Sequence, residues 1–145
     1  MNMRIAPSVL AEIRRHLAAA YPGEGCGFLV GTRGPNGDVV VRQQLPVTNR
    51  RTADGGGRTR YLIGPEDFLT AEREARQASF VVLGTYHSHP DVPARPSGYD
   101  TEHAWPWSCY LIASVAGGAV REERVWELRD DRSGFVEREL EVKES

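Results

Sequence analysis

The spacing of apolar residues predicts two amphipathic helices. In the first, four apolar residues recur at helical spacing and form one stripe: Val9, Leu10, Ile13 and Leu17. Pro7 suits the first turn of this helix, and the sequence YPG at 21–23 ends it. The second helix is predicted over 64–79, where Pro65 stands at the start, acidic residues follow in the first turn, and arginines lie towards the end.

Shorter apolar runs predict strands. CGFLVG and DVVVRQQLPV are separated by turn residues and predict a hairpin. FVVLGTYHSH is apolar on both faces until its histidines, which is typical of a central strand that is covered above and below. YLI is expected as a short strand, and SCYLIASV, VREERVWELR and GFVERELEV as three more, the last two joined as a hairpin across DDRSG. This order predicts the α/β class, with a mixed sheet flanked by helices.

Composition and charge narrow the kind of protein. The chain has 145 residues and a net charge of -2, so no overall positive field indicates nucleic acid or an anionic membrane as a partner. Its two cysteines form no CxxC pair, which excludes a cysteine-rich zinc module and a secreted disulfide framework. No apolar run approaches the roughly 20 residues of a membrane span, and no signal-peptide pattern opens the chain. We expect one cytoplasmic domain over residues 1–145.

Two histidines end the predicted central strand. His87 and His89 are two residues apart, so both rings point to the same face, where they form a bidentate grip for a divalent metal. A catalytic zinc usually takes three protein ligands, and Asp100 is the best third candidate. The prolines between His89 and Asp100 stiffen the connection, whereas Asp91 follows the histidines directly and leads away from them.

The stretch SGYD has a second interpretation. Ser97 and Asp100 have the spacing of a capping box that opens a helix in GYDTEHAW, so both residues would satisfy backbone donors. The two roles are compatible, because the first turn of a helix is also a rigid platform for a ligand. His103 shares the helix face of Asp100 and is expected beside the site or in solvent, and His16 is expected at the surface.

A zinc-activated water also needs a base. Glu24 lies among glycines at the entry to a buried strand, where the backbone can approach another segment closely; the alternative is a turn carboxylate in water. Cys26 is expected as a small core residue rather than a nucleophile. Trp105 and Trp107 are expected to pack at the end of the helix, and the alternative is that they form a wall of the substrate site. The chain contains no HExxH, no HxE with PCxxC and no GxSxG.

Taken together, these stretches resemble the signature of the JAMM (MPN+) metallopeptidases in their short prokaryotic form. That signature is a glutamate, then His-x-His-Pro, then an aspartate eleven positions after the second histidine, with a serine three before the aspartate. The chain matches it with Glu24, HSHP at 87–90, Ser97 and Asp100, and the resemblance extends over nearly the whole chain.

The resemblance implies a role for each matched residue. His87, His89 and Asp100 would hold one zinc ion, Glu24 would be the general base, and Ser97 would donate a hydrogen bond to the oxyanion of the tetrahedral intermediate. It also implies a mixed, curved sheet between helices, related in shape to the cytidine deaminases.

The same resemblance implies the substrate class. Small bacterial members cut the peptide or isopeptide bond after the C-terminal Gly-Gly of ubiquitin-like or sulfur-carrier proteins. The short loop at 49–58 argues against specificity for polyubiquitin chains. Four arginines could bind an acidic carrier protein, and the alternative is that they belong to a solvated linker: Arg50, Arg51, Arg58 and Arg60. Two alternatives stay open, which are a zinc hydrolase of small amides and a non-catalytic MPN scaffold that only binds partners.

Overall fold

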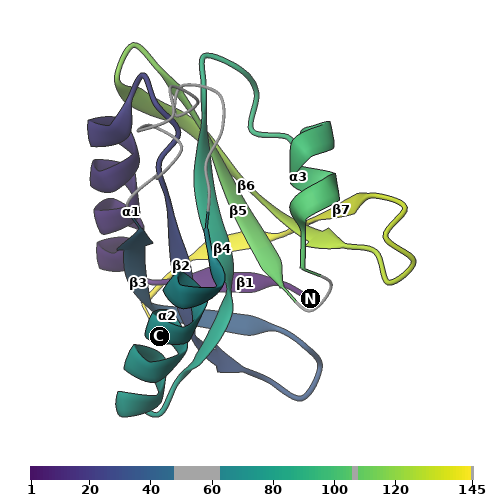
Figure 1. Ribbon diagram of the computed structural model, residues 1–145. Coiled ribbons are helices and arrows are strands. Elements are labelled where there is room, and N and C mark those ends of the chain that lie inside the picture. The colour runs from purple at the N-terminus through teal and green to yellow at the C-terminus, as the bar shows by residue number, and fades with distance from the viewer. Residues whose placement is uncertain (48–62, 106–107, 145) are drawn as a thin grey trace.

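The computed structural model describes residues 1–47, 63–105 and 108–144 (Figure 1). Eight strands in these ranges form one sheet, in the order β7-β6-β5-β4-β2-β3-β1-β8. The strands are β1 (Met3–Ile5), β2 (Cys26–Arg33), β3 (Val39–Val47), β4 (Val81–Pro90), β5 (Cys109–Ala116), β6 (Ala119–Leu128), β7 (Phe135–Arg138) and β8 (Leu140–Val142). The helices are α1 (Pro7–Ala20), α2 (Pro65–Gln77) and α3 (Gly98–His103).

Most of the predicted elements are confirmed. Both long helices are present, β2 and β3 form the expected antiparallel hairpin, and β4 occupies the middle of the sheet between β2 and β5. The sheet is mixed, since β4 pairs antiparallel with β2 and parallel with β5. The predicted α/β class with a mixed, curved sheet is therefore correct.

The prediction of a single last strand is wrong. GFVERELEV forms two strands, because β7 pairs antiparallel with β6 whereas β8 pairs parallel with β1 at the opposite edge of the sheet. Only Glu139 separates them, and its carbonyl accepts a hydrogen bond from the amide of Met3 at 2.9 Å. The sheet therefore curves until its two edges meet, and it is nearly closed. The three-residue strand β1 was not predicted, and most of the expected YLI strand lies outside the described residues.

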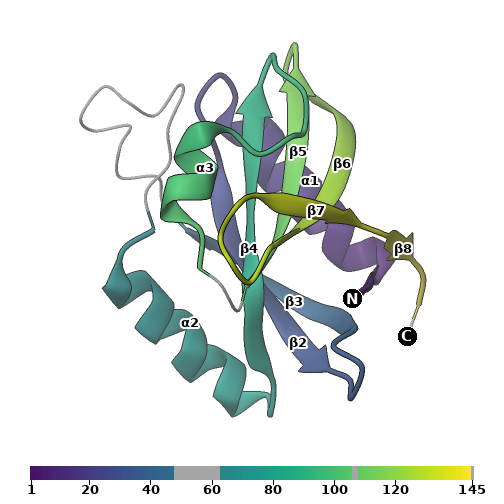
Figure 2. The ribbon, with the colours of Figure 1, turned by 90° about the vertical axis from the view of Figure 1, so that its right-hand side faces the viewer.

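The helices cover opposite faces of the sheet. Figures 1 and 2 show α1 on one side of β4 and α3 on the other. The apolar stripe of α1 packs into the larger core, which includes Leu29, Leu83 and Tyr86 from the sheet. α2 packs through Ala71 and Ala75 in a second cluster on the other face. Since side chains alternate along a strand, β4 directs Tyr86 towards α1 and His87 towards the face of α3.

One expectation about this fold is wrong. His16 on α1 is half-buried rather than a simple surface residue, since its Nε2 lies 3.0 Å from the carbonyl oxygen of Cys26 and its ring meets Tyr86 edge to face.

No helix among the described residues combines the length and the apolar character needed to cross a membrane.

Candidate metal centre

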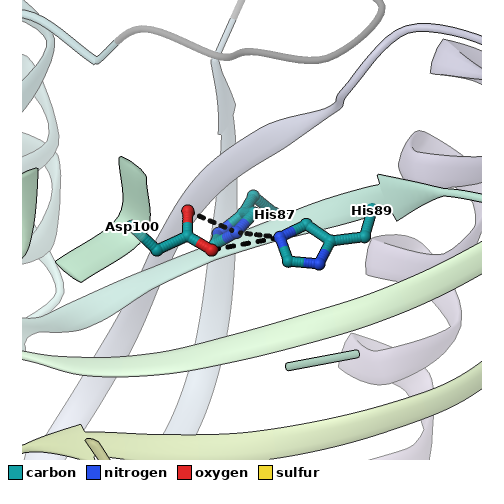
Figure 3. Close-up of side chains that lie close together, drawn as sticks. All are labelled: His87, His89 and Asp100. Atoms are coloured by element: carbon teal, nitrogen blue, oxygen red, sulfur yellow. Dashed lines mark hydrogen bonds and ion pairs between the residues drawn. The ribbon is translucent and has the colours of Figure 1, made fainter. Parts of the chain in front are cut away.

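Strand β4 and helix α3 bring three side chains together at the C-terminal end of β4. His87 and His89 come from the strand, Asp100 comes from the first turn of the helix, and all three point towards one another (Figure 3). The two Nε2 atoms are 3.2 Å apart, Oδ1 of Asp100 lies 3.2 Å from Nε2 of His87, and Oδ2 lies 3.1 Å from Nε2 of His89. The structure thus assembles the three residues that the sequence singled out as ligands.

The donor atoms of this group fit a tetrahedral zinc. Zinc bound at about 2.0 Å by each ligand of a tetrahedron separates neighbouring ligand atoms by about 3.3 Å. The two Nε2 atoms, 3.2 Å apart, match that spacing. Each of them lies 3.1–3.2 Å from a different carboxylate oxygen of Asp100, and one ligand atom from each residue lies within 4.8 Å of the others, which is close enough for the three to hold one ion. Two imidazole nitrogens and one carboxylate oxygen are also the donor set of a catalytic zinc that keeps one position open. All three residues are buried, at most 6% exposed, so the site is built from groups already withdrawn from water.

The electrostatics of the group favour a bound cation. Burial alone would raise the pKa of Asp100, yet the hydrogen bonds with His87 and His89 hold that pKa far below its ordinary value, so the carboxylate is charged. Burial lowers the pKa of His87, which outweighs the opposing effect of Asp100 and favours the neutral imidazole. A neutral imidazole and an ionised carboxylate are the forms that bind metal.

A backbone carbonyl fixes the orientation of His89. Its Nδ1 lies 3.0 Å from the carbonyl oxygen of Pro93, so Nδ1 donates there and Nε2 is directed at Asp100. Metal-binding histidines characteristically place their other ring nitrogen against such a partner. The same contacts also affect the pKa of His89. Burial lowers this pKa, but the hydrogen bonds to Asp100 and Pro93 and the negative charges of Asp100 and Glu24 outweigh burial and raise it.

The capping box predicted in SGYD is present. The Oγ of Ser97 accepts a hydrogen bond from the amide of Asp100 at 3.1 Å, and the amide of Ser97 donates to Oδ2 of Asp100 at 2.8 Å. The capping interpretation is therefore correct for both residues. In the capping box the oxygen of Ser97 only accepts a hydrogen bond, so the hydroxyl hydrogen of this exposed residue can still be donated to another group. The capping role and a catalytic hydrogen bond are therefore compatible.

Glu24 lies beside this group. Cys26 of β2 is the register partner of His87, so the chain ahead of Cys26 runs along the end of β4. The amide of Gly25 donates to Oγ of Ser88 at 2.9 Å, and the amide of Ser88 donates to the carbonyl of Gly25 at 3.0 Å. Glu24 is 7% exposed, so the alternative of a turn carboxylate in water is wrong.

The glycines around Glu24 permit this close approach. A Cβ on Gly27 would come within 2.4 Å of the Tyr86 ring on β4, and one on Gly25 would come within 2.9 Å of Leu17 on α1. Larger residues would push the loop away from both elements, and with it Glu24.

The other residues that the sequence analysis considered do not belong to the group formed by His87, His89 and Asp100. Cys26 is fully buried, and burial raises its pKa to about 12, so it is a core residue, as expected, rather than a nucleophile. Cys109 is also a free thiol, and β4 runs between the strands that carry the two cysteines. His103 is exposed and stacks on Tyr99 with ring centroids 4.0 Å apart. Trp105 packs edge to face on Phe68, as expected. Trp107 and the four loop arginines lie outside the described residues.

Two supporting contacts were not predicted from the sequence. Ser88 stands between the two histidines and holds Gly25, and the hydroxyl of Tyr21 donates to both carboxylate oxygens of Asp91 at 2.9 Å. A hydroxyl residue inside His-x-His is a signal that could have indicated the first contact. Both contacts tie the segment 21–25, which carries Glu24, to the end of β4.

Comparisons with known proteins agree on one family. The profile described as prokaryotic homologs of the JAB domain matches residues 6–129. A desampylase of Haloferax volcanii is 32% identical over 117 residues, which are 80% of this chain and 80% of that protein. The CysO-cysteine peptidase of Mycobacterium tuberculosis is 29% identical over 124 residues, 76% of this chain and 80% of that protein. The solution structure of a Salinibacter ruber protein is 41% identical in sequence and has a TM-score of 0.76. The match covers 98% of this chain and 92% of the Salinibacter ruber chain.

Proposed function

The chain belongs to the family of prokaryotic homologs of the JAB domain, the short prokaryotic JAMM (MPN+) type, and on this premise we propose that it is a zinc metallopeptidase. Its substrate would be the amide bond that follows the C-terminal Gly-Gly of a ubiquitin-like or sulfur-carrier protein. Residues 1–145 would form one catalytic domain.

One observation carries the proposal. Two imidazole nitrogens and a carboxylate oxygen lie within 4.8 Å of one another, close enough to hold one zinc ion, and the buried Glu24 precedes the start of the neighbouring strand β2. Two histidines and one carboxylate are a donor set that catalytic zinc takes, and the presence of the complete set favours an enzyme over a scaffold that only binds partners.

The residues would divide the reaction as follows. His87, His89 and Asp100 would hold zinc, which when bound polarises a carbonyl and lowers the pKa of a water to about 7. Glu24 would take a proton from the attacking water and deliver it to the leaving nitrogen. A C–O bond forms first, and the C–N bond then breaks, which gives the carboxylate of the carrier tail and a free amine. Ser97 would donate its hydroxyl hydrogen to the oxyanion that forms between these steps.

The substrate class is supported by the relatives. The names desampylase and CysO-cysteine peptidase indicate hydrolysis of conjugates of ubiquitin-like or sulfur-carrier proteins, and the desampylase is 32% identical over 80% of this chain. An extended Gly-Gly tail would add beside a strand near the zinc by main-chain hydrogen bonds. The leaving amine would be either an amino acid or a lysine side chain.

The test measures metal and activity together. Elemental analysis should find about one zinc per chain in the wild type and a loss of zinc in Asp100→Ala. The wild type should cleave a ubiquitin-like carrier joined through its Gly-Gly to lysine, and Glu24→Gln should retain zinc without cleaving. Cleavage of short peptide amides but not of carrier conjugates would favour a hydrolase of small amides. A wild type that takes up no zinc would favour the binding scaffold.

A further inference from the structure

The loop that follows β4 holds one of the histidines through its backbone. Nδ1 of His89 bonds to the carbonyl of Pro93, which is the middle residue of the segment 92–94. The position of this carbonyl decides how the His89 ring is turned, and hence where its Nε2 points. Contacts that hold the segment 92–94 in place therefore also hold Nε2 of His89, one of the three donor atoms.

Three residues in register across neighbouring strands contact this segment. His89 of β4 is the register partner of Ser114 of β5, and Ser114 is the partner of Glu122 of β6. Register partners carry their side chains on the same face of a sheet. His89 bonds to the carbonyl of Pro93, Oγ of Ser114 donates to the carbonyl of Val92 at 2.7 Å, and Oε1 of Glu122 accepts from the amide of Ala94 at 3.2 Å. The row thus holds three consecutive residues of the loop.

A fourth side chain completes the support. Trp126 lies four residues after Glu122 on β6 and therefore on the same face. Its Nε1 donates to the carbonyl of Ala94 at 3.1 Å. Both backbone groups of Ala94, a fully buried residue, are thus held by side chains of β6. The amide of Ala94 is also the main cause that lowers the pKa of Glu122, so the acceptor there is charged.

We infer that Ser114, Glu122 and Trp126 are positioning residues that set the zinc affinity of the site, by holding the segment 92–94 so that the carbonyl of Pro93 orients His89. Figure 2 shows the connection from β4 to α3 passing the end of β5, where these contacts form. The inference rests on the proposed zinc site. Partners of this kind typically change metal affinity tenfold to a hundredfold, and since these three act through the backbone, we expect about tenfold for each.

The experiment compares matched variants in a zinc titration against a competing chelator. Trp126→Phe removes the indole donor and Ser114→Ala removes the hydroxyl, and each should bind zinc about tenfold more weakly than the wild type. Ser114→Thr restores a hydroxyl and should restore the affinity. Val125→Ala is the control for stability, because Val125 is the neighbour of Trp126 on β6 but is buried in the core on the opposite face, away from the loop. It should lower the melting temperature of the metal-free protein and leave the zinc affinity unchanged.

The visible spectrum of the Co2+-substituted protein provides a second readout. Trp126→Phe should alter the ligand-field bands, which respond to the geometry at the metal and not to global stability. The inference is overturned if Trp126→Phe and Ser114→Ala bind zinc as tightly as the wild type, or if Val125→Ala weakens zinc binding as much as they do. If the wild type itself binds no zinc, the proposed function fails first and this inference falls with it.

Discussion

Cys26 on β2 lies directly opposite His87 on β4. The two strands are antiparallel, so the residues ahead of Cys26 run beside those that follow His87, and Glu24 arrives beside His89. Gly25 and Ser88, which lie between these pairs, exchange two hydrogen bonds. The strand register therefore brings together a glutamate and a pair of histidines that are more than sixty residues apart in the sequence.

Ser88→Ala tests whether this register contact serves the base. The change leaves the buried amide of Gly25 without its hydroxyl acceptor, so the segment that carries Glu24 should shift away from β4. Removing a buried partner costs about 1–3 kcal/mol of stability, and a misplaced base should lower kcat by about tenfold or more. Zinc content and KM should stay at wild-type values, because neither the ligands nor the substrate face is altered. Steady-state kinetics with metal analysis measures both effects.

Two variants test whether the effect is specific to the hydroxyl of Ser88. Ser88→Thr keeps the hydroxyl and should restore kcat. Thr85→Val removes another buried hydroxyl of β4, one with no hydrogen-bond partner among the described residues, and should leave kcat unchanged. An equal loss of kcat in Ser88→Ala and Thr85→Val would contradict a specific role for Ser88.

Glu24→Gln should separate zinc binding from catalysis. The amide is nearly the same size as the carboxylate but cannot accept a proton from water, so turnover should fall by about a hundredfold to ten-thousandfold. Zinc binding should be retained, because Glu24 lies outside the group of three donor atoms. Single-turnover cleavage of a carrier conjugate, with zinc measured in the same samples, provides the test. Substantial turnover by the zinc-loaded variant would assign the base to another residue.

The sequence predicted those parts of the site that depend on local rules. The period of two along a strand was enough to place His87 and His89 on one face, and the capping spacing placed Asp100 in the first turn of α3. The approach of Glu24 to the histidines, by contrast, depends on the register of β2 against β4, which no local pattern records. The split of GFVERELEV into β7 and β8 depends on the closure of the sheet, and a three-residue strand is too short to show a period. The resemblance to the JAMM signature singled out Glu24, but the register that brings it to the histidines is seen only in the fold.

Ser97 is predicted to have two roles that can be separated. Ser97→Gly should cost only a few tenths of a kcal/mol as a helix cap, because glycine is tolerated at the N-cap. It removes the hydroxyl donor, however, so kcat should fall by about a hundredfold to a thousandfold if Ser97 stabilises the oxyanion. Ser97→Thr keeps both the cap and the hydroxyl and should remain active. Full activity of a correctly folded Ser97→Gly would leave Ser97 with the capping role alone.

The buried cysteines predict a weakness at alkaline pH. Burial raises the pKa of Cys26 and of Cys109 from 9.0 to about 12, so the folded protein keeps both thiol protons where the unfolded chain releases them. The unfolded state then binds fewer protons, so the free energy of unfolding should fall as the pH rises from 9 towards 12, by on the order of 1 kcal/mol per pH unit for each thiol. Below pH 9 both states hold the protons and this effect vanishes. Urea unfolding across this range, compared with a Cys26→Ala, Cys109→Ala double variant, measures how the free energy of unfolding changes with pH in each protein. Equal slopes for the two proteins would contradict the assignment.

The native thiols should likewise resist iodoacetamide at neutral pH and react once the chain is unfolded.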